Sequence, residues 1–247
     1  MIKKILFLLL GTVTFVTAKA ETTDYKLDVH DFSELVVVDG INVDYFCKPD
    51  SAGIAVFSCE PEMASHIMFS QKNDRLTIRT DADEHPIAGV PGVRVYSSSL
   101  AKVENSGDST LRVHVTAPVS TFKAKQIGNG TLIIDNIVAD RVDAGITTGK
   151  GLLVINGKAQ KATITNVSTG PIDASSLEVG DLKCVLFGTG NIEANPVDNL
   201  RVYGTGPGAV IYKKRPAKVS NRSIGVKVHS GEETAPQQSE TTKTSSK

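Results

Sequence analysis

A glycine-containing turn that returns at nearly constant spacing constrains the fold of this chain more than any other feature. The turns lie at 106–108, 128–130, 149–151, 169–171, 188–190 and 204–208. Six glycines serve as equivalent structural turn positions, with separations of 23, 21, 19, 20 and 16 residues: Gly107, Gly130, Gly151, Gly170, Gly190 and Gly206. Self-similarity at such a period indicates a repeat architecture, in which each unit stacks on the next.

Short apolar or β-branched runs separate the glycine turns. They lie at 110–115, 132–134, 152–155 and 210–212, and a second run follows about ten residues later in most units, at 141–144, 161–165 and 181–186. Runs this short, bounded by turn residues, are typical of strands. Each coil is therefore expected to hold about two strands, and the coils must stack because one coil cannot bury its apolar side alone.

The fold predicted from this pattern is all-β. It is a right-handed parallel β-helix-like solenoid with an N-terminal β-rich cap and one short helix. Glycine suits its corners because tight turns often need positive φ and adjacent backbones approach closely there. The alternative is an antiparallel β-sandwich, since sandwich strands also recur at short, regular intervals.

The two ends of the chain differ from the repeat. Residues 1–20 are expected to be an export signal, with Lys3 and Lys4 before an apolar stretch at 5–16 and the small-residue pattern Ala18-Lys19-Ala20. Twelve apolar residues are too few to span a bilayer, so a membrane anchor is the weaker interpretation. The protein is therefore predicted to be exported, to the periplasm, the cell surface or the medium. Residues 230–247 are polar and predict a disordered tail.

The segment before the repeat is also rich in strand patterns. Strands are predicted at 35–38, 41–45, 54–57 and 76–79, a hairpin loop at 48–53, and a helix at 61–69 that covers one end of the sheet. A lead-in at 21–31 precedes a single domain at 32–229, which divides into an N-terminal β part at 32–100 and the glycine-turn repeat at 101–229. An acidic, proline-containing loop is expected between 81 and 92.

Five segments carry a resemblance to a known family: DFSEL at 31–35, VDGINV at 38–43, NDRLTI at 73–78, VRVY at 93–96 and SGD at 106–108. With them the chain resembles the head GIN domain family, also described as autotransporter adhesin heads of Bacteroidetes, over about 32–228. The resemblance implies an exported β-helical domain of poorly defined function. Since the shared positions are mostly turns and strands, it implies a fold more securely than a role.

Bulk charge points to no polyanionic partner. The 247 residues include 27 basic and 27 acidic side chains, a formal net charge of zero, which suggests neither nucleic acid nor an anionic membrane as a partner. After the signal, no segment is long enough for an integral membrane helix.

The chain has three cysteines, Cys47, Cys59 and Cys184, so they cannot all pair with one another. The sequence favours buried free thiols, and a disulfide between Cys47 and Cys59 is the alternative.

No cofactor or metal site is predicted. The stretch Gly145–Gly151 has three residues between its glycines where a phosphate loop needs four, and Gly151 replaces the Ser or Thr that would hold magnesium. The histidines are scattered without ligand-pair spacing, at His30, His66, His85, His114 and His229.

Acids near the coil corners give the best case for an enzyme, a polysaccharide lyase or glycosidase. They are Asp108, Asp135, Asp140, Asp143, Asp173, Asp181 and Glu193, with Arg141 and Lys183 nearby. Because they fall at different distances after each glycine, they are expected to scatter around the coil instead of forming an acid/base pair. No catalytic residues are therefore predicted.

Polar side chains between the turns favour a binding role. The residues Thr147, Thr148, Thr163, Thr165, Asn166 and Thr169 are expected to line a flat, repetitive face. The function predicted from the sequence is a non-catalytic exported β-solenoid in cell-surface or envelope adhesion, with a glycan or an envelope protein as partner.

Overall fold

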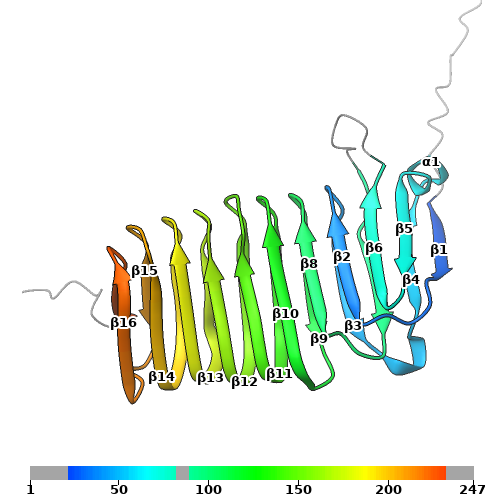
Figure 1. Cartoon of the computed structure of the whole chain (residues 1–247). Coiled ribbons are helices and arrows are strands. Elements are labelled where there is room, and N and C mark those ends of the chain that lie inside the picture. Colours follow the sequence, from blue (N-terminus) through cyan, green and yellow to red (C-terminus); the bar gives the residue numbers. More distant parts are fainter. Residues whose placement is uncertain (1–21, 82–88, 232–247) are drawn as a thin grey trace, which may run out of the picture.

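A computed structural model describes residues 22–81 and 89–231. The predicted export signal, the segment 82–88 of the predicted acidic loop and nearly all of the predicted tail lie outside the described residues. Within the described ranges, seventeen strands join one continuous curled sheet that forms a solenoid of about six turns (Figure 1). The predicted all-β solenoid is confirmed, and the parallel pairing of its coils excludes the sandwich.

The regular coils are built from five consecutive parallel strands. These are β10 (Val119–Ile127), β11 (Thr131–Ile146), β12 (Leu152–Asn166), β13 (Ile172–Phe187) and β14 (Ile192–Thr205). Each strand from β11 to β14 turns a corner near its middle. In β11 the corner lies between Ile134 and Ile137, where its pairing with β12 is irregular. The first part of β11 pairs with β9 (Thr110–Val115), whereas its second part pairs with β10. One long strand therefore contributes to two sides of the curled sheet, which are called here sheet one and sheet two.

These two sheets form the sides of the solenoid. Sheet one contains β6 (Arg75–Thr80), β2 (Glu34–Val38), β8 (Lys102–Ser106), β10, the second parts of β11–β14, and β16 (Lys218–Ile224). Sheet two contains β7 (Val93–Ser97), β3 (Val43–Cys47), β9, the first parts of β11–β14, β15 (Ala209–Tyr212) and β17 (Lys227–Ser230).

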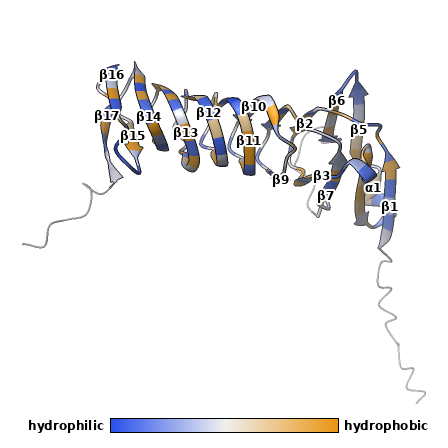
Figure 2. Ribbon diagram, turned by 90° about the horizontal axis from the view of Figure 1, so that it is seen from below, coloured by the Kyte–Doolittle hydropathy of each residue, from blue (hydrophilic) through white to orange (hydrophobic). Residues whose placement is uncertain are grey.

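The core lies between the two sheets. Residues in register on sheet one are buried in a row that runs along the solenoid: Phe122, Val142, Ala162, Leu182 and Leu200. Sheet two contributes the facing row Leu132, Leu153, Ile172, Ile192 and Val210. Hydrophobic and hydrophilic residues alternate along the ribbons (Figure 2), so every coil adds one layer to a continuous apolar core.

The turn glycines stack in two columns along one edge. The first column holds Gly130, Gly151, Gly170, Gly190 and Gly208, and a Cβ added at each of the last four would meet the backbone oxygen of the glycine before it at 1.9–2.6 Å. Gly107 and Gly206 lie instead with Gly128, Gly149 and Gly188 in the second column. The six turn glycines predicted to be equivalent thus come from both columns, because most turns carry two glycines. The close approach of the backbones of neighbouring coils explains why these positions are glycine.

The N-terminal coils are not stacked in chain order. Strand β2 lies between β6 and β8, and β3 lies between β7 and β9. The chain therefore forms its first coil with β2 and β3, adds β6 and β7 on the outer side, and returns to continue with β8 and β9. Beyond β7, β4 (Ile54–Cys59) runs antiparallel to β7 and to β1 (Thr23–Asp28), which completes this end of the solenoid.

The predicted hairpin at 48–53 is wrong. The segment contains the short 3-10 helix η1 (Pro49–Ser51), but the strands on either side of it pair with other strands: β3 with β7 and β9, and β4 with β1 and β7. Strand β7 is the neighbour of both, parallel to β3 and antiparallel to β4. A segment about forty residues away in the sequence thus occupies the place that a hairpin partner would take.

The predicted helix at 61–69 is also too long. Helix α1 covers only Pro61–Ala64, and β5 (Ile67–Lys72) follows as an antiparallel partner of β6. Asn73 adopts φ +53° in the turn between them, a conformation that asparagine tolerates. The Asn-Asp turn therefore favours a hairpin over continuation of the helix. In the described part of the chain, no helix is long and apolar enough to cross a membrane.

The three cysteines are free thiols in different surroundings. Cys59 and Cys184 are buried, and complete burial raises the pKa of the Cys184 thiol to about 12. Cys47 is half-buried, and its Sγ donates to the carbonyl of Ser98 at 3.3 Å.

Thiol labelling is expected to separate these cysteines. With iodoacetamide at about pH 8, Cys47 should be alkylated in the folded protein, whereas Cys184 should react only after unfolding, since the thiolate is the nucleophile and access is required. Mass spectrometry of digests taken over time measures the order. Alkylation of native Cys184 as fast as Cys47 would contradict the buried position.

Candidate binding faces of the solenoid

The outward side chains of sheet one form a surface rich in cations, called here the cationic face. Its eleven basic residues are Arg75, Arg79, Lys102, Lys123, Lys125, Arg141, Lys161, Lys183, Arg201, Lys218 and Arg222. Its four acidic residues are Glu34, Glu104, Asp143 and Asp181. The chain as a whole is neutral, so the fold has concentrated positive charge on one side.

Most cations at the centre of this face lack a carboxylate partner. Glu34 is held by Arg75 at 2.9 Å and by Lys102 at 3.5 Å, and Asp143 is held by Arg141 at 3.2 Å. Among the described residues, no carboxylate oxygen lies within 4.0 Å of the basic groups of Lys123, Lys125, Lys161, Lys183, Arg201, Lys218 or Arg222. These seven are called the unpaired cations.

Three pairs of like charges face each other across neighbouring strands. Lys102 is in register with Lys123, Arg141 with Lys161, and Lys183 with Arg201. Like charges directly opposite are destabilising, so these three pairs do not serve the stability of the sheet. Lys123, Lys125 and Lys161 each also stand opposite an acidic residue, namely Asp143, Glu104 and Asp181. Lys183 finds its contact with a neutral group instead, as its Nζ lies 5.3 Å from the ring centre of Tyr203.

Two depressions lie on the cationic face. The larger has a volume of about 500 Å³, and its lining includes Gly145, which stands in register between Lys125 and Thr165 and contributes no side chain. Lys102, Lys123 and Thr163 also line it. The smaller, of about 320 Å³, is lined by Asp181, Asn199, Leu200, Arg201, Lys218 and Ser220. Both depressions therefore combine cations with uncharged hydrogen-bonding groups, and most of the lining of the larger one is apolar, with Val103, Ala144 and Val167 among its residues.

Glu34 is the most strongly held carboxylate of this face. The hydrogen bond from Arg75 holds the pKa of Glu34 below its ordinary value; partial burial opposes this effect, and the charge of Lys102 reinforces it. A carboxylate with a lowered pKa in the folded state adds stability above its unfolded pKa and loses it as the pH falls through the folded value.

Glu34→Gln is therefore expected to lower the free energy of unfolding at pH 7 by less than about 1 kcal/mol, since the pair is partly exposed. The difference should shrink as the pH falls below about 4, where Glu34 itself becomes neutral. Urea unfolding of both proteins across this pH range measures it. A difference that stays constant with pH would show that the charge of Glu34 is not its source.

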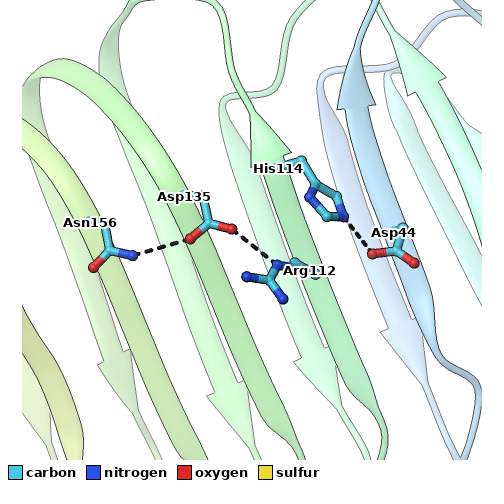
Figure 3. Close-up of polar contacts among 5 residues, drawn as sticks. All are labelled: Asp44, Arg112, His114, Asp135 and Asn156. Atoms are coloured by element: carbon cyan, nitrogen blue, oxygen red, sulfur yellow. Dashed lines mark hydrogen bonds and ion pairs between the residues drawn. The ribbon is translucent and has the colours of Figure 1, made fainter.

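Sheet two presents a different surface, on which two charged pairs join neighbouring strands. His114 Nε2 lies 2.7 Å from Asp44 Oδ1, and Arg112 Nε donates to Asp135 Oδ2 at 3.0 Å (Figure 3). Asn156 donates to the other oxygen of Asp135 at 3.1 Å. These contacts join neighbouring coils and give the charged groups of Asp44, Arg112, His114 and Asp135 partners within the protein.

Stacked rings continue this surface toward the N-terminal end. The ring of Phe46 lies 4.4 Å from that of His114 and 5.7 Å from that of Tyr96, and the Lys48 ammonium lies 5.4 Å from the Tyr96 ring centre. The rings are only half-exposed. We interpret the stack as cross-strand packing that stabilises the irregular N-terminal coils.

Most of the acids considered for catalysis lie apart, but Asp173 and Glu193, which were expected to scatter, stand opposite each other on neighbouring strands. Asp143 and Asp181 are on sheet one, whereas Asp135, Asp173 and Glu193 are on sheet two, where Asp173 and Glu193 are in register. Asp108 accepts from Asn129 in a glycine turn, and Asp140 accepts from Gln160 at a corner. Arg141 contacts Asp143, and Lys183 lies over Tyr203.

The histidines do not assemble into a ligand set either. His30, His66, His114 and His229 are described, while His85 lies outside the described residues. Within 22–81 and 89–231, no three His, Cys, Asp or Glu side chains are placed to hold a metal ion.

The predicted threonine face is divided. Thr163 and Thr165 lie on the cationic face, whereas Thr147, Thr148 and Thr169 are exposed at the turns. Asn166 was expected on the surface but is fully buried. Its Nδ2 donates to the carbonyl of Gly170 at 2.9 Å, and its Oδ1 accepts from the backbone N–H and the hydroxyl of Ser168. The side chain points inward because it satisfies the turn that follows it.

Of the unpaired cations, only Lys183 was named from the sequence, beside the acids considered for catalysis. The signal was present as alternation, since Lys123-Ala124-Lys125 and Lys161-Ala162-Thr163 place buried alanines between outward polar residues. Only the register between coils shows that these segments lie on one side.

Comparison with known proteins places the chain in a structural group. Its fold is similar to that of a crystal structure titled a putative adhesin from Bacteroides fragilis NCTC 9343, with TM-score 0.76 and 17% identity over 86% of this chain and 97% of the other. A putative adhesin from Parabacteroides distasonis ATCC 8503 gives TM-score 0.65 and 22% identity over 85% and 97%. A putative lipid binding protein from the same strain gives TM-score 0.66 and 14% identity over 85% and 96%.

At these identities the structural likeness shows the fold alone. No curated protein matches the chain. A family model does match, over residues 31–216, which is more than half of the chain; its description is "Putative auto-transporter adhesin, head GIN domain". The chain therefore belongs to the head GIN domain family.

Proposed function

We propose that this protein is a non-catalytic exported β-solenoid that acts in adhesion or interaction at the cell surface or envelope. The observation that carries the proposal is the cationic face: a continuous row of outward side chains with unpaired cations and two depressions. A rigid repetitive face of this kind suits contact with an extended partner. The carboxylates, in contrast, are dispersed over two sheets.

The family and two of the similar structures support this direction through their descriptions as adhesins. The predicted export signal at 1–20 is consistent with an envelope location. Fractionation of cells into cytoplasm, periplasm and membranes, followed by N-terminal sequencing, tests the location. A mature chain beginning at Glu21 outside the cytoplasm is the expected result, and an uncleaved cytoplasmic chain would contradict it.

The test of function is a binding measurement with an activity control. Labelled mature protein should bind in a saturable manner to envelope extracts or to glycans on an array. Polysaccharides incubated with the protein should keep their chain length. Polysaccharide cleavage that disappears in Asp143→Asn or Asp173→Asn would overturn the proposal in favour of an enzyme. These two residues lie on opposite sheets, so the variants also show which side would carry the activity.

A further inference from the structure

We propose that the cationic face binds an anionic polysaccharide, whose acidic groups enter the two depressions. This inference deepens the proposed function, on which it rests, by naming the class of partner and the surface that binds it. The bulk composition suggests no such partner because the net charge is zero. The structure separates the charges by side.

The unpaired cations span a length suited to a polymer. They begin at Lys123 and Lys125 on β10 and continue to Lys218 and Arg222 on β16, with the intervening cations on β12, β13 and β14. Six neighbouring strands at the usual strand spacing cover ~24 Å. A single small anion would use only a fraction of this surface, whereas a chain with repeated negative charges can contact all of it.

The depressions favour a polysaccharide over a flat anionic bilayer. The larger one combines Lys123 and Lys125 with the hydroxyls of Thr163 and Thr165, and the smaller one combines Arg201 and Lys218 with Asn199 and Ser220. Carboxylate or sulfate groups can be bound by the cations and sugar hydroxyls by the neutral groups. A bilayer would contact only the rims.

The carboxylates within the depressions are already engaged. Asp143 accepts from Arg141 at 3.2 Å, and Asp181 accepts from Asn199. They reduce the positive potential locally and still leave the surrounding cations in excess. Exposed Phe187 and Ile224 at the margin of the same face, together with exposed Val167 in the lining of the larger depression, are the features that would favour a lipid surface. Anionic vesicles are therefore a necessary comparison.

The experiment measures binding of the mature protein to polygalacturonate, which carries carboxylates, and to dextran sulfate, with neutral dextran as the reference. The parent protein should bind one or both polyanions and not dextran. The affinity should fall as sodium chloride is raised from low to physiological concentration, because surface charges are screened within about 8 Å at 0.15 M salt. The two polyanions distinguish carboxylate from sulfate recognition.

A matched pair of variants locates the site. Lys123→Gln/Lys125→Gln/Lys161→Gln removes three unpaired cations from the cationic face, and Arg94→Gln/Lys213→Gln/Lys227→Gln removes three exposed cations from the opposite side. The first variant should bind about tenfold more weakly, since exposed charge contacts each contribute modestly. The second should stay within about twofold of the parent. Thermal unfolding of both variants checks that they remain folded.

Equal loss in both variants, or no loss in the first, would overturn the assignment to this face. Binding of phosphatidylglycerol vesicles or duplex DNA as tightly as the polyanions would overturn the assignment to polysaccharide. If the parent binds envelope extracts but neither polyanion, this inference fails and the proposed function stands. If the parent binds neither extracts nor polyanions, both fail.

Discussion

Gly170→Ala is expected to lower the free energy of unfolding by about 3 kcal/mol, among the largest effects available to a single methyl group in this fold. The added Cβ would lie 1.9 Å from the carbonyl oxygen of Gly151 and 2.8 Å from the carbonyl carbon of Lys150. These are backbone atoms of the neighbouring coil, so no side chain can rotate away. The coils would have to separate locally, and the hydrogen bonds between them would weaken.

The matched control is Gly40→Ala, because nothing lies within 4 Å of a Cβ at that position. It should change stability by less than about 0.5 kcal/mol. Urea unfolding followed by circular dichroism measures both variants, and the midpoint of thermal unfolding should fall by roughly 10 °C for Gly170→Ala alone. Equal stability of the two variants would show that close backbone stacking does not explain the glycine turns.

Asn166→Ala is expected to lower the free energy of unfolding by a similar amount, about 3 kcal/mol, for a different reason. The amide of Asn166 donates to the Gly170 carbonyl and accepts from the backbone N–H of Ser168 at 3.1 Å, inside a turn with no access to water. Alanine would leave both backbone groups buried without these partners. An unsatisfied buried group costs much more than the bond itself contributes.

Asn156→Ala provides the comparison, since Asn156 is half-buried on sheet two and donates one hydrogen bond, to Asp135 at 3.1 Å. Water can replace that bond, so Asn156→Ala should lower the free energy of unfolding by less than about 1 kcal/mol. The two variants are compared by the same urea titration. A smaller loss for Asn166→Ala than for Asn156→Ala would contradict the role of Asn166 inside the turn.

The repeat was predictable because each coil repeats the same physical requirement. Small residues are needed wherever backbones meet, as at Gly151 and Gly170, and apolar residues are needed at every second strand position. Both requirements leave a periodic trace in the sequence. Polar residues at the turns gave less information, because the pattern does not distinguish Asn166, which points inward, from Thr165, which points outward.

The winding of the N-terminal coils could not be predicted from local signals. Lys48 to Gly53 has the composition of a hairpin turn, yet the strand that pairs with both neighbours, Val93–Ser97, comes from far along the chain. Long-range pairing of this kind depends on which apolar surfaces fit together. Local propensity carries no information about it.

The candidate site was hidden for a related reason. Net charge sums over all sides of the molecule, whereas binding depends on which side each charge faces. Lys123 and Lys183 are 60 positions apart and lie on the same face only because each coil advances the chain by one strand. The register between coils shows that lysines far apart in the sequence lie on one face.

Carbodiimide cross-linking of the mature protein to polygalacturonate tests the central claim most directly, because it joins sugar carboxylates to the lysine amines they contact. Peptide mass spectrometry then identifies the lysines. Cross-links at Lys123, Lys125, Lys161, Lys183 and Lys218 are the result expected for the cationic face. Cross-links concentrated at Lys213 and Lys227, on the opposite sheet, would contradict it.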